Sequence, residues 1–254
     1  MSASPSPPLD VSVRLHPPYC PFGPPAAFVD AWLSELRASS LNRYPDCAAR
    51  ELRSAISRQV HQPFERVFAA NGSNEVLQTL LLTYGGPGRR ALVFEPTYAL
   101  HAHIARITGT GIISAHRDDE FGIDLPNALS IIAAEQPEIV FVCSPNNPSG
   151  TVEPAATVAA IVTAAPGLVI VDEAYGEFAP ESALTQITDD RALVVTRTYY
   201  KVWSLAALRL GLAVGPGRPG AERDKVVMPD HLQAQPETAG RRARGGGGSA
   251  EDGR

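Results

Sequence analysis

Short runs of Val, Ile, Leu and Phe recur through the middle of the chain and alternate with segments whose apolar residues are spaced as on a helix. A run that is apolar at nearly every position predicts a strand buried on both faces, which is typical of parallel sheets. Parallel strands connected by helices make an α/β domain. The predicted strands, of which the fifth is expected to be the last, are RVFAA (66–70), RALVFEP (90–96), EIVFVCSP (138–145), GLVIVDEA (167–174) and ALVVTRT (192–198).

The remaining segments set the expected domain organisation. We expect residues 1–45 to form a Pro-rich extended arm and a short helix, and residues 46–217 to form the large domain. The Gly/Arg-rich residues 239–254 cannot bury enough apolar surface to order themselves, so disorder is predicted there. Helical spacing predicts helices at 29–40, 47–59, 76–85, 98–109 and 157–163, and from Leu205 onward.

The charge, the apolar runs and the cysteine spacing exclude several kinds of partner and site. The formal net charge of −5 gives no general attraction for nucleic acid or an anionic membrane. No apolar run is long enough to span a bilayer, and the Ser/Pro-rich start lacks the apolar segment of a signal peptide. Cys20, Cys47 and Cys143 form neither a disulfide framework nor a zinc-binding spacing. We therefore expect a cytoplasmic protein that binds no nucleic acid, membrane or metal.

Polar residues follow several of the predicted strands, and in open α/β sheets a ligand binds at the carboxyl ends of the strands. The first group is Gly72-Ser73-Asn74, which opens the helix after RVFAA. Free N–H groups at a helix start, together with the helix dipole, suit a phosphate. Taken alone, the group is better explained as an N-cap supported by Glu75 in the first turn.

Three further polar or aromatic residues follow the later strands. Asp172 ends an apolar strand, where a carboxylate is costly unless it has a partner such as a protonated ring nitrogen. A helix cap explains Asp172 about equally well. The Tyr175 phenol could reach the same ligand, and Asn147 could donate to a ligand oxygen, although turn chemistry alone explains Asn147. Tyr98 could stack on a flat ring, although a packed aromatic is more common.

Lys201 lies in the stretch RTYYKVWSLAALRLG, among mostly aromatic and aliphatic residues. A lysine attacks an aldehyde readily only when desolvation or a nearby cation favours its neutral amine. Arg209 could be the cation, although an incidental surface lysine is more common by base rate. The neighbours that could supply the desolvation are Tyr199, Tyr200, Val202 and Trp203.

Considered together, these groups fit one ligand. A phosphate cradle, an anion for a ring nitrogen, hydrogen-bond donors for a ring oxygen, a stacking aromatic and an imine-forming lysine describe a site for pyridoxal 5′-phosphate. The weak individual signals support one another because their order and their placement at strand ends agree.

The same segments resemble the class I/II aminotransferases, which are pyridoxal-phosphate enzymes of fold type I, and within them the histidinol-phosphate branch. The resemblance implies a three-layer α/β/α large domain with a mostly parallel central sheet. It covers roughly residues 42–215. The motifs that carry it are NRYPD, AANGSNEVLQ, FEPTYALH, FVCSPNNPSG, IVDEAYGEF and RTYYKVWSLAALRLG.

The resemblance also implies a role for each site residue. Lys201 would form a Schiff base with the cofactor and later move a proton between the substrate Cα and the cofactor. Asp172 would keep the pyridine nitrogen protonated. The other implied contacts are Tyr175 and Asn147 at the ring oxygen, Tyr98 stacked on the ring, and Gly72, Ser73, Asn74, Thr198 and Arg209 at the phosphate.

The implied activity is amino-group transfer between histidinol phosphate, or a related aromatic amino acid, and 2-oxoglutarate, a step of histidine biosynthesis. Tyr44 of NRYPD matches a tyrosine that reaches into the neighbouring subunit's site, which implies a homodimer. A phospho-amino-acid decarboxylase of the same fold is an alternative, faintly supported by LHPPYCPFGPP near the N-terminus.

Two departures from the family pattern bear on activity. Where the family usually has a serine just before the lysine, this chain has Tyr200, which removes a small hydroxyl from the phosphate-binding group and adds bulk beside the amine. Residues 218–238 resemble only a remnant of the family's linker helix. We expect the C-terminal small domain to be absent, with the arginine that would bind the substrate carboxylate, so a catalytically impaired cofactor-binding remnant is a second hypothesis.

Nucleotide binding and metal binding find little support. No G-x-G-x-x-G follows the first predicted strand, and no Walker pattern is present. His101 and His103 are two residues apart in a predicted helix, so they do not share a face and make a poor metal pair.

Overall fold

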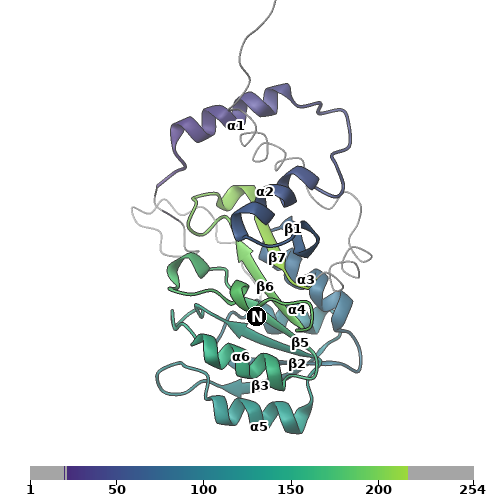
Figure 1. Cartoon of the computed structure of the whole chain (residues 1–254), viewed down its shortest axis with the longest axis vertical. Coiled ribbons are helices and arrows are strands. Elements are labelled where there is room, and N and C mark those ends of the chain that lie inside the picture. Colours follow the sequence, from purple (N-terminus) through teal and green to yellow (C-terminus); the bar gives the residue numbers. More distant parts are fainter. Residues whose placement is uncertain (1–19, 21, 217–254) are drawn as a thin grey trace, which may run out of the picture.

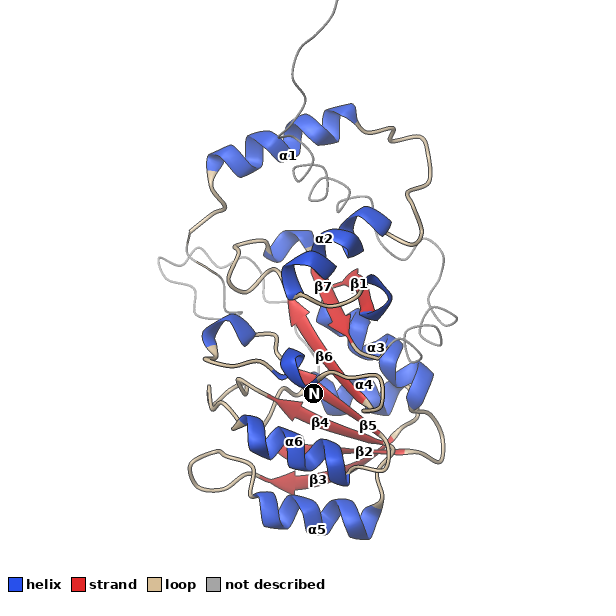
Figure 2. Cartoon of the chain, viewed as in Figure 1, coloured by secondary structure: helices blue, strands red, loops and turns tan. Residues whose placement is uncertain are grey.

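The computed structural model describes residue 20 and residues 22–216 of the 254-residue chain, and across these residues a seven-stranded sheet carries helices on both faces (Figure 1). The spatial order of the strands is β1-β7-β6-β5-β4-β2-β3 (Figure 2). This is the predicted α/β architecture. The strands are β1 (Val67–Asn71), β2 (Arg90–Glu95), β3 (Gly111–His116), β4 (Ile139–Cys143), β5 (Leu168–Asp172), β6 (Leu193–Thr198) and β7 (Leu210–Val214).

Strand direction determines which residues can meet. The five neighbouring strands from β6 to β3 are parallel, whereas β7 is antiparallel to both β1 and β6. Leu210 pairs with Asn71, and Gly211 pairs with Thr198. One edge of the sheet, called the carboxyl edge below, therefore gathers the ends of β1, β2, β4, β5 and β6 and the beginning of β7.

The helices form the two outer layers. One face of the sheet packs on α2 (Arg50–Val60), α5 (Leu125–Glu135) and α6 (Ala155–Ala164), and the other on α3 (Ser73–Tyr84) and α4 (Leu100–Ile107). Within β4, Val140 and Val142 belong to the first core and Ile139 and Phe141 to the second. Both faces of the strand are thus buried, which is why its sequence is apolar at every position.

Helix α1 (Ala26–Ala38) differs from the others because it contributes no buried residue. It lies beyond α2, at the top of Figure 1, away from the sheet. Its apolar side chains are therefore not part of either core.

The region between residues 110 and 136 contains β3 and α5, two elements that the sequence did not predict. Near the end of the described chain, the helix predicted from Leu205 is only a 3-10 turn, Ala206–Leu208, and β7 follows. The expectation that ALVVTRT forms the last strand is therefore wrong. Burial of Leu212, Ala213 and Val214 between two strands outweighs the helical preference of this stretch.

Some predictions fall on residues that are not described. The linker remnant at 218–238, the tail at 239–254 and most of the N-terminal arm lie outside the described residues. Within the described ranges, no helix is both long and apolar enough to cross a membrane.

Candidate functional site

A cavity opens at the carboxyl edge, between the ends of β4, β5 and β6 and the start of α3. It contains about 290 Å³ of space, some of which is open to solvent. Residues from distant segments of the sequence meet here because parallel strands end at the same edge. Six predicted site residues line this cavity: Ser73, Tyr98, Asn147, Asp172, Tyr175 and Lys201.

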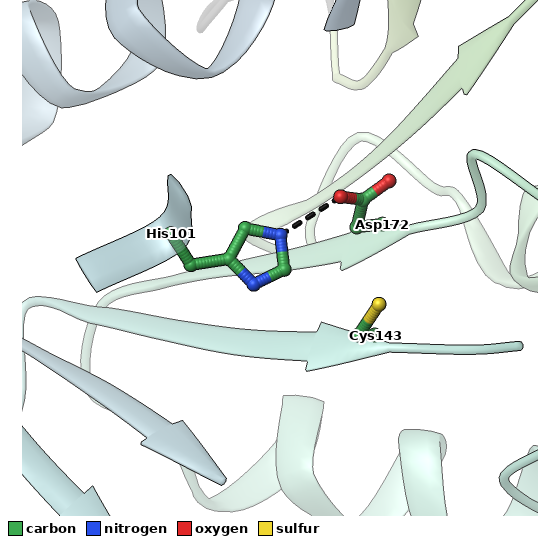
Figure 3. A group of neighbouring side chains, drawn as sticks. All are labelled: His101, Cys143 and Asp172. Carbon is green, nitrogen blue, oxygen red and sulfur yellow. Dashed lines mark hydrogen bonds and ion pairs between the residues drawn. The ribbon is translucent and has the colours of Figure 1, made fainter. Parts of the chain in front are cut away.

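Asp172, at the end of β5, presents a fixed carboxylate to the cavity. Its side chain is almost fully buried, and Nε2 of His101 lies 2.8 Å from its Oδ2 (Figure 3). The Ala174 N–H donates to Oδ1 at 3.0 Å, and the Thr196 hydroxyl donates to the same oxygen at 3.3 Å. These three partners compensate for the loss of water around the carboxylate and fix its orientation.

His101 is a site residue that the sequence did not reveal. Its side chain is fully buried, with the ring stacked on Phe141 at 4.7 Å between centroids and meeting Tyr98 edge-on at 5.4 Å. The signal was its place on the buried face of α4, because a histidine there needs a polar partner, whereas His103 is exposed. The Nδ1 atom has no hydrogen-bond partner within the described chain.

Cys143 lies beside this pair, and the three candidate ligand atoms of His101, Cys143 and Asp172 are within 4.8 Å of one another (Figure 3). Burial, with a smaller contribution from the Asp172 charge, raises the pKa of Cys143 to about 12. Burial thus disfavours the thiolate form of Cys143.

Lys201 follows β6, and its Nζ lies on the cavity wall 5.0 Å from the ring centroid of Tyr175 and 5.5 Å from that of Tyr200. Tyr200 is one of the four predicted neighbours, whereas Tyr175 was not predicted as one. Trp203 is 49% exposed, and the Tyr199 hydroxyl donates to Gln59 on α2. One of the two rings near the amine thus belongs to Tyr175, which is distant in the chain.

The start of α3 has a backbone that only glycine allows. Gly72 is the N-cap residue at φ +86°, and a Cβ there would lie 2.9 Å from Nη2 of Arg209. A Cβ at Gly211 would lie 2.3 Å from the carbonyl carbon of Gly72, so β7 and the helix start are in backbone contact. Because the N-cap is a glycine, no side chain caps the first turn of α3, although Glu75 supports it by accepting the Asn71 N–H.

Three residues meet at this helix start. Ser73 is buried, and its Oγ lies 3.2 Å from the Tyr200 hydroxyl. The Arg209 guanidinium lies 4.6 Å from the centroid of the Tyr200 ring. We call Gly72, Ser73 and Arg209 the cup. The region offers backbone N–H groups, a hydroxyl and a cation, which is the chemistry that binds a phosphate.

Tyr98 contributes an aromatic ring to the lining of the cavity. Its hydroxyl donates to Oδ1 of Asn74 at 3.2 Å, and burial, with the Tyr200 phenol next in size, raises the pKa of Tyr98 to about 12. The phenol is therefore neutral and its ring is held by a hydrogen bond at one end and His101 at the other.

Asn147 is positioned by the residue before it. The buried Asn146 accepts from Thr97 at 2.9 Å and donates to the carbonyl of Pro96 at 3.1 Å and to Ser149 at 2.8 Å. These bonds fix the turn after β4, which places Asn147 at the cavity.

Five predicted site residues are not among those that line the cavity: Gly72, Asn74 and Arg209, described above, and Thr198 and Tyr44. The Thr198 side chain is buried, and its hydroxyl donates to the carbonyl of Ala174 at 3.1 Å. Tyr44, in the connection between α1 and α2, is 88% exposed and is not among the residues that line the cavity.

Comparison with known proteins identifies the family of the chain. A profile described as aminotransferase class I and II matches residues 19–227. The histidinol-phosphate aminotransferase of Corynebacterium diphtheriae is 44% identical over 223 residues, which are 84% of this chain and 61% of that protein. The protein of the same name from Thermobifida fusca is 42% identical, covering 89% of this chain and 64% of that protein. The chain thus spans less than two thirds of the length of these relatives.

Solved structures show the same fold. The histidinol-phosphate aminotransferase from Sinorhizobium meliloti, in complex with pyridoxal-5′-phosphate, superposes with a TM-score of 0.81 at 22% identity, over 88% of this chain and 61% of that one. The one from Clostridium acetobutylicum gives 0.77 at 21% identity, over 88% and 66%. From the profile match and the sequence identity together, the chain belongs to the class I and II aminotransferase family.

Proposed function

We propose that this chain is the cofactor-binding portion of a pyridoxal-phosphate-dependent aminotransferase that exchanges an amino group between histidinol phosphate and 2-oxoglutarate. Residues 46–217 would be the cofactor-binding domain. The observation that carries the proposal is the convergence of Lys201, Asp172 and the start of α3 on one cavity. The choice of substrate rests on relatives named histidinol-phosphate aminotransferase at 40–44% identity.

The residues present fit the proposed cofactor. When bound, pyridoxal phosphate supplies an aldehyde that condenses with amines, releasing water, and a ring that accepts an electron pair. The cavity offers a lysine amine for the aldehyde and a buried carboxylate for the ring nitrogen. The α3 start, which no side chain caps, suits the phosphate. The aldehyde, the ring nitrogen and the phosphate would thus each meet a group of suitable chemistry.

Lys201 and Asp172 would perform the chemical work. The Lys201 amine would hold the cofactor and then carry the proton removed from the substrate Cα. The Asp172 carboxylate would hold a proton on the ring nitrogen, in an orientation set by His101, Ala174 and Thr196. Burial strengthens this interaction because little water competes for the carboxylate.

The other residues would orient the ring. Tyr98 would stack on it, and Tyr175 and Asn147 would bind its oxygen. The phosphate would bind the N–H groups near Ser73 and Asn74 together with Arg209. Thr198 would have to release the carbonyl of Ala174 before it could donate to the phosphate.

Reduction with borohydride tests the site, because the chain has only two lysines, Lys201 and Lys225. We expect pyridoxal phosphate bound to the protein to produce an absorbance band at longer wavelength than that of the free cofactor. After reduction with borohydride, mass spectrometry should locate the label on Lys201. Lys201→Ala should abolish the band and the label, whereas Lys225→Ala should keep both. A label that stays with Lys225, or no label on folded protein, would overturn the site.

A turnover assay then tests the reaction. Histidinol phosphate and 2-oxoglutarate should give glutamate and a keto product. Histidinol phosphate has no carboxyl group, so the decarboxylase is tested in a separate assay with a phosphorylated amino acid, from which release of carbon dioxide would indicate it instead. Labelling of Lys201 without any product would support the catalytically impaired remnant.

We also propose a homodimer in the cytoplasm. Phe22, Leu41 and Tyr44 flank α1 and are each at least 77% exposed, which favours a partner that covers them. Cys20, Cys47 and Cys143 are free, as expected in a reducing compartment. Sedimentation of the purified chain as a monomer at micromolar concentration would contradict the dimer.

A further inference from the structure

We propose that the Tyr200 side chain occupies the cup in the cofactor-free protein, so that a phosphate must displace it in order to bind. Tyr200 would then set how strongly the site prefers a phosphorylated cofactor over an unphosphorylated one. This inference rests on the proposed function, because it concerns the same cofactor.

The contacts of Tyr200 carry the inference. Its side chain is 9% exposed, with the hydroxyl 3.2 Å from Oγ of Ser73 and the ring 4.6 Å from the Arg209 guanidinium carbon. A Cβ placed on Gly72 would lie 3.6 Å from Cε1 of Tyr200, so the ring lies directly against the glycine at the helix start. Tyr200 therefore contacts the hydroxyl, the cation and the backbone turn that would bind a phosphate.

A phosphate and a phenol ring cannot fill the same space. To bind Ser73 and Arg209 together, a phosphate needs the position between them, where the Tyr200 ring now lies. Before it binds, the hydrogen bond to Ser73 and the cation–π contact with Arg209 must break. Tyr200 hence acts as an internal competitor of the phosphate.

The size of the competition follows from those two contacts. A hydrogen bond and a cation–π contact of this kind are together worth a factor of about ten in an equilibrium constant. We expect Tyr200→Ala to tighten binding of pyridoxal phosphate about tenfold on this basis. Pyridoxal lacks the phosphate, so its affinity should stay the same.

A second variant isolates the hydroxyl. Tyr200→Phe keeps the ring and its contact with Arg209 but frees the Ser73 hydroxyl, so pyridoxal phosphate should bind about threefold tighter. If the phenol were instead a phosphate donor, the same variant would bind it more weakly. The sign of the change therefore separates the two roles even if Tyr200→Ala fails to fold.

The experiment measures dissociation constants of pyridoxal phosphate and pyridoxal from bound-cofactor absorbance, with folding checked by circular dichroism. Tyr199→Phe is the matched control, because the Tyr199 hydroxyl donates to Gln59 instead. A rise in the ratio of the two affinities for both Tyr200 variants, but not for Tyr199→Phe, is expected. If the ratio in the Tyr200 variants is unchanged or lower, while the wild type is labelled at Lys201, the role proposed for Tyr200 is wrong but the proposed function stands. Absence of labelling in the folded wild type overturns the proposed function.

Discussion

Glu153 and Asp172, two of the buried carboxylates near the carboxyl edge, have opposite surroundings. Glu153 faces the guanidinium of Arg117 at 2.5 Å, and neither side chain lines the cavity. Arg117 also donates to the carbonyls of Phe94 and Phe121, and Glu153 accepts the Ile123 N–H. Charge and hydrogen-bonding capacity are thus matched within the protein itself.

Asp172 has partners too, but it stays at the wall of a cavity. His101 is its nearest charged or polar side chain, and Nδ1 of that histidine has no partner in the described residues. The difference teaches that burial alone does not mark a functional carboxylate. A closed pair holds elements together, whereas a carboxylate that is fixed in orientation and faces a cavity can bind a ligand.

Breaking the closed pair should have the largest effect on stability. Glu153→Gln leaves the buried Arg117 charge without its counter-ion, so we expect the free energy of unfolding to fall by about 3–5 kcal/mol. Urea denaturation measures this. Glu135→Gln is the control, because its pair with Arg90 is 45–46% exposed at the side chains, and the expected loss is at most about 1 kcal/mol. Equal losses for the two variants would contradict the contrast.

Neutralising the open carboxylate should affect binding more than folding. Asp172→Asn keeps the size of the side chain and an oxygen for the Ala174 N–H, so its unfolding free energy should fall less than that of Glu153→Gln. A hydrogen bond to a charged group is worth about 1.5–3 kcal/mol, so pyridoxal phosphate should bind about 10- to 150-fold more weakly. Titration followed by absorbance checks this, and unaltered affinity would rule out the role of Asp172.

Cys143 touches both carboxylate sites, because its carbonyl accepts from Arg117 and its thiol lies beside Asp172. Its pKa is raised in the fold, from 9.0 to about 12, so the folded state keeps a proton that the unfolded state loses above pH 9. The contribution of this proton to the free energy of unfolding is fully present below pH 9, and it is lost as the pH rises toward 12. Between pH 9 and 10 the free energy of unfolding of the wild type should fall by up to about 1.4 kcal/mol because of this thiol, and Cys143→Ala should lack that fall.

Urea denaturation at pH 8, 9 and 10 measures that slope. The range stops at pH 10 because Tyr98 and Tyr199, each with a pKa raised to about 12 mainly by burial, begin to contribute above it. The same slope in wild type and Cys143→Ala would show that the thiol does not titrate on unfolding in this range.

Much of the fold could be predicted because its signals are local. The five predicted strands are apolar on both faces, and parallel strands end at one edge, so the proximity of Asp172 and Asn147 follows from the pattern of residues alone. In contrast, β3 lies at the edge of the sheet, and its mostly exposed or half-buried residues show no continuous apolar run.

What the sequence did not show depends on distant contacts. The stretch after Leu205 has helical preference, but pairing with β1 and β6 makes it β7. His101 became a site residue only because α4 packs its buried face toward the end of β5. Tyr200 could be recognised as a departure from the family pattern, but its contacts with Ser73 and Arg209 depend on three separate segments.

The position of β7 between β1 and β6 has a consequence for protein synthesis. In the described sheet β1 is hydrogen-bonded only to β7. Val67 at the start of β1 can therefore pair only after Val214, which is 147 residues later in the chain, has been synthesised. A nascent chain that has emerged from the ribosome only as far as β6 already contains Asp172. It does not yet contain β7, which contacts the start of α3 at Gly72. Closing such a long loop is slow, and a coenzyme that binds both segments stabilises only chains that have closed it. The proposed cofactor would thereby favour molecules in which β7 has already paired with β1.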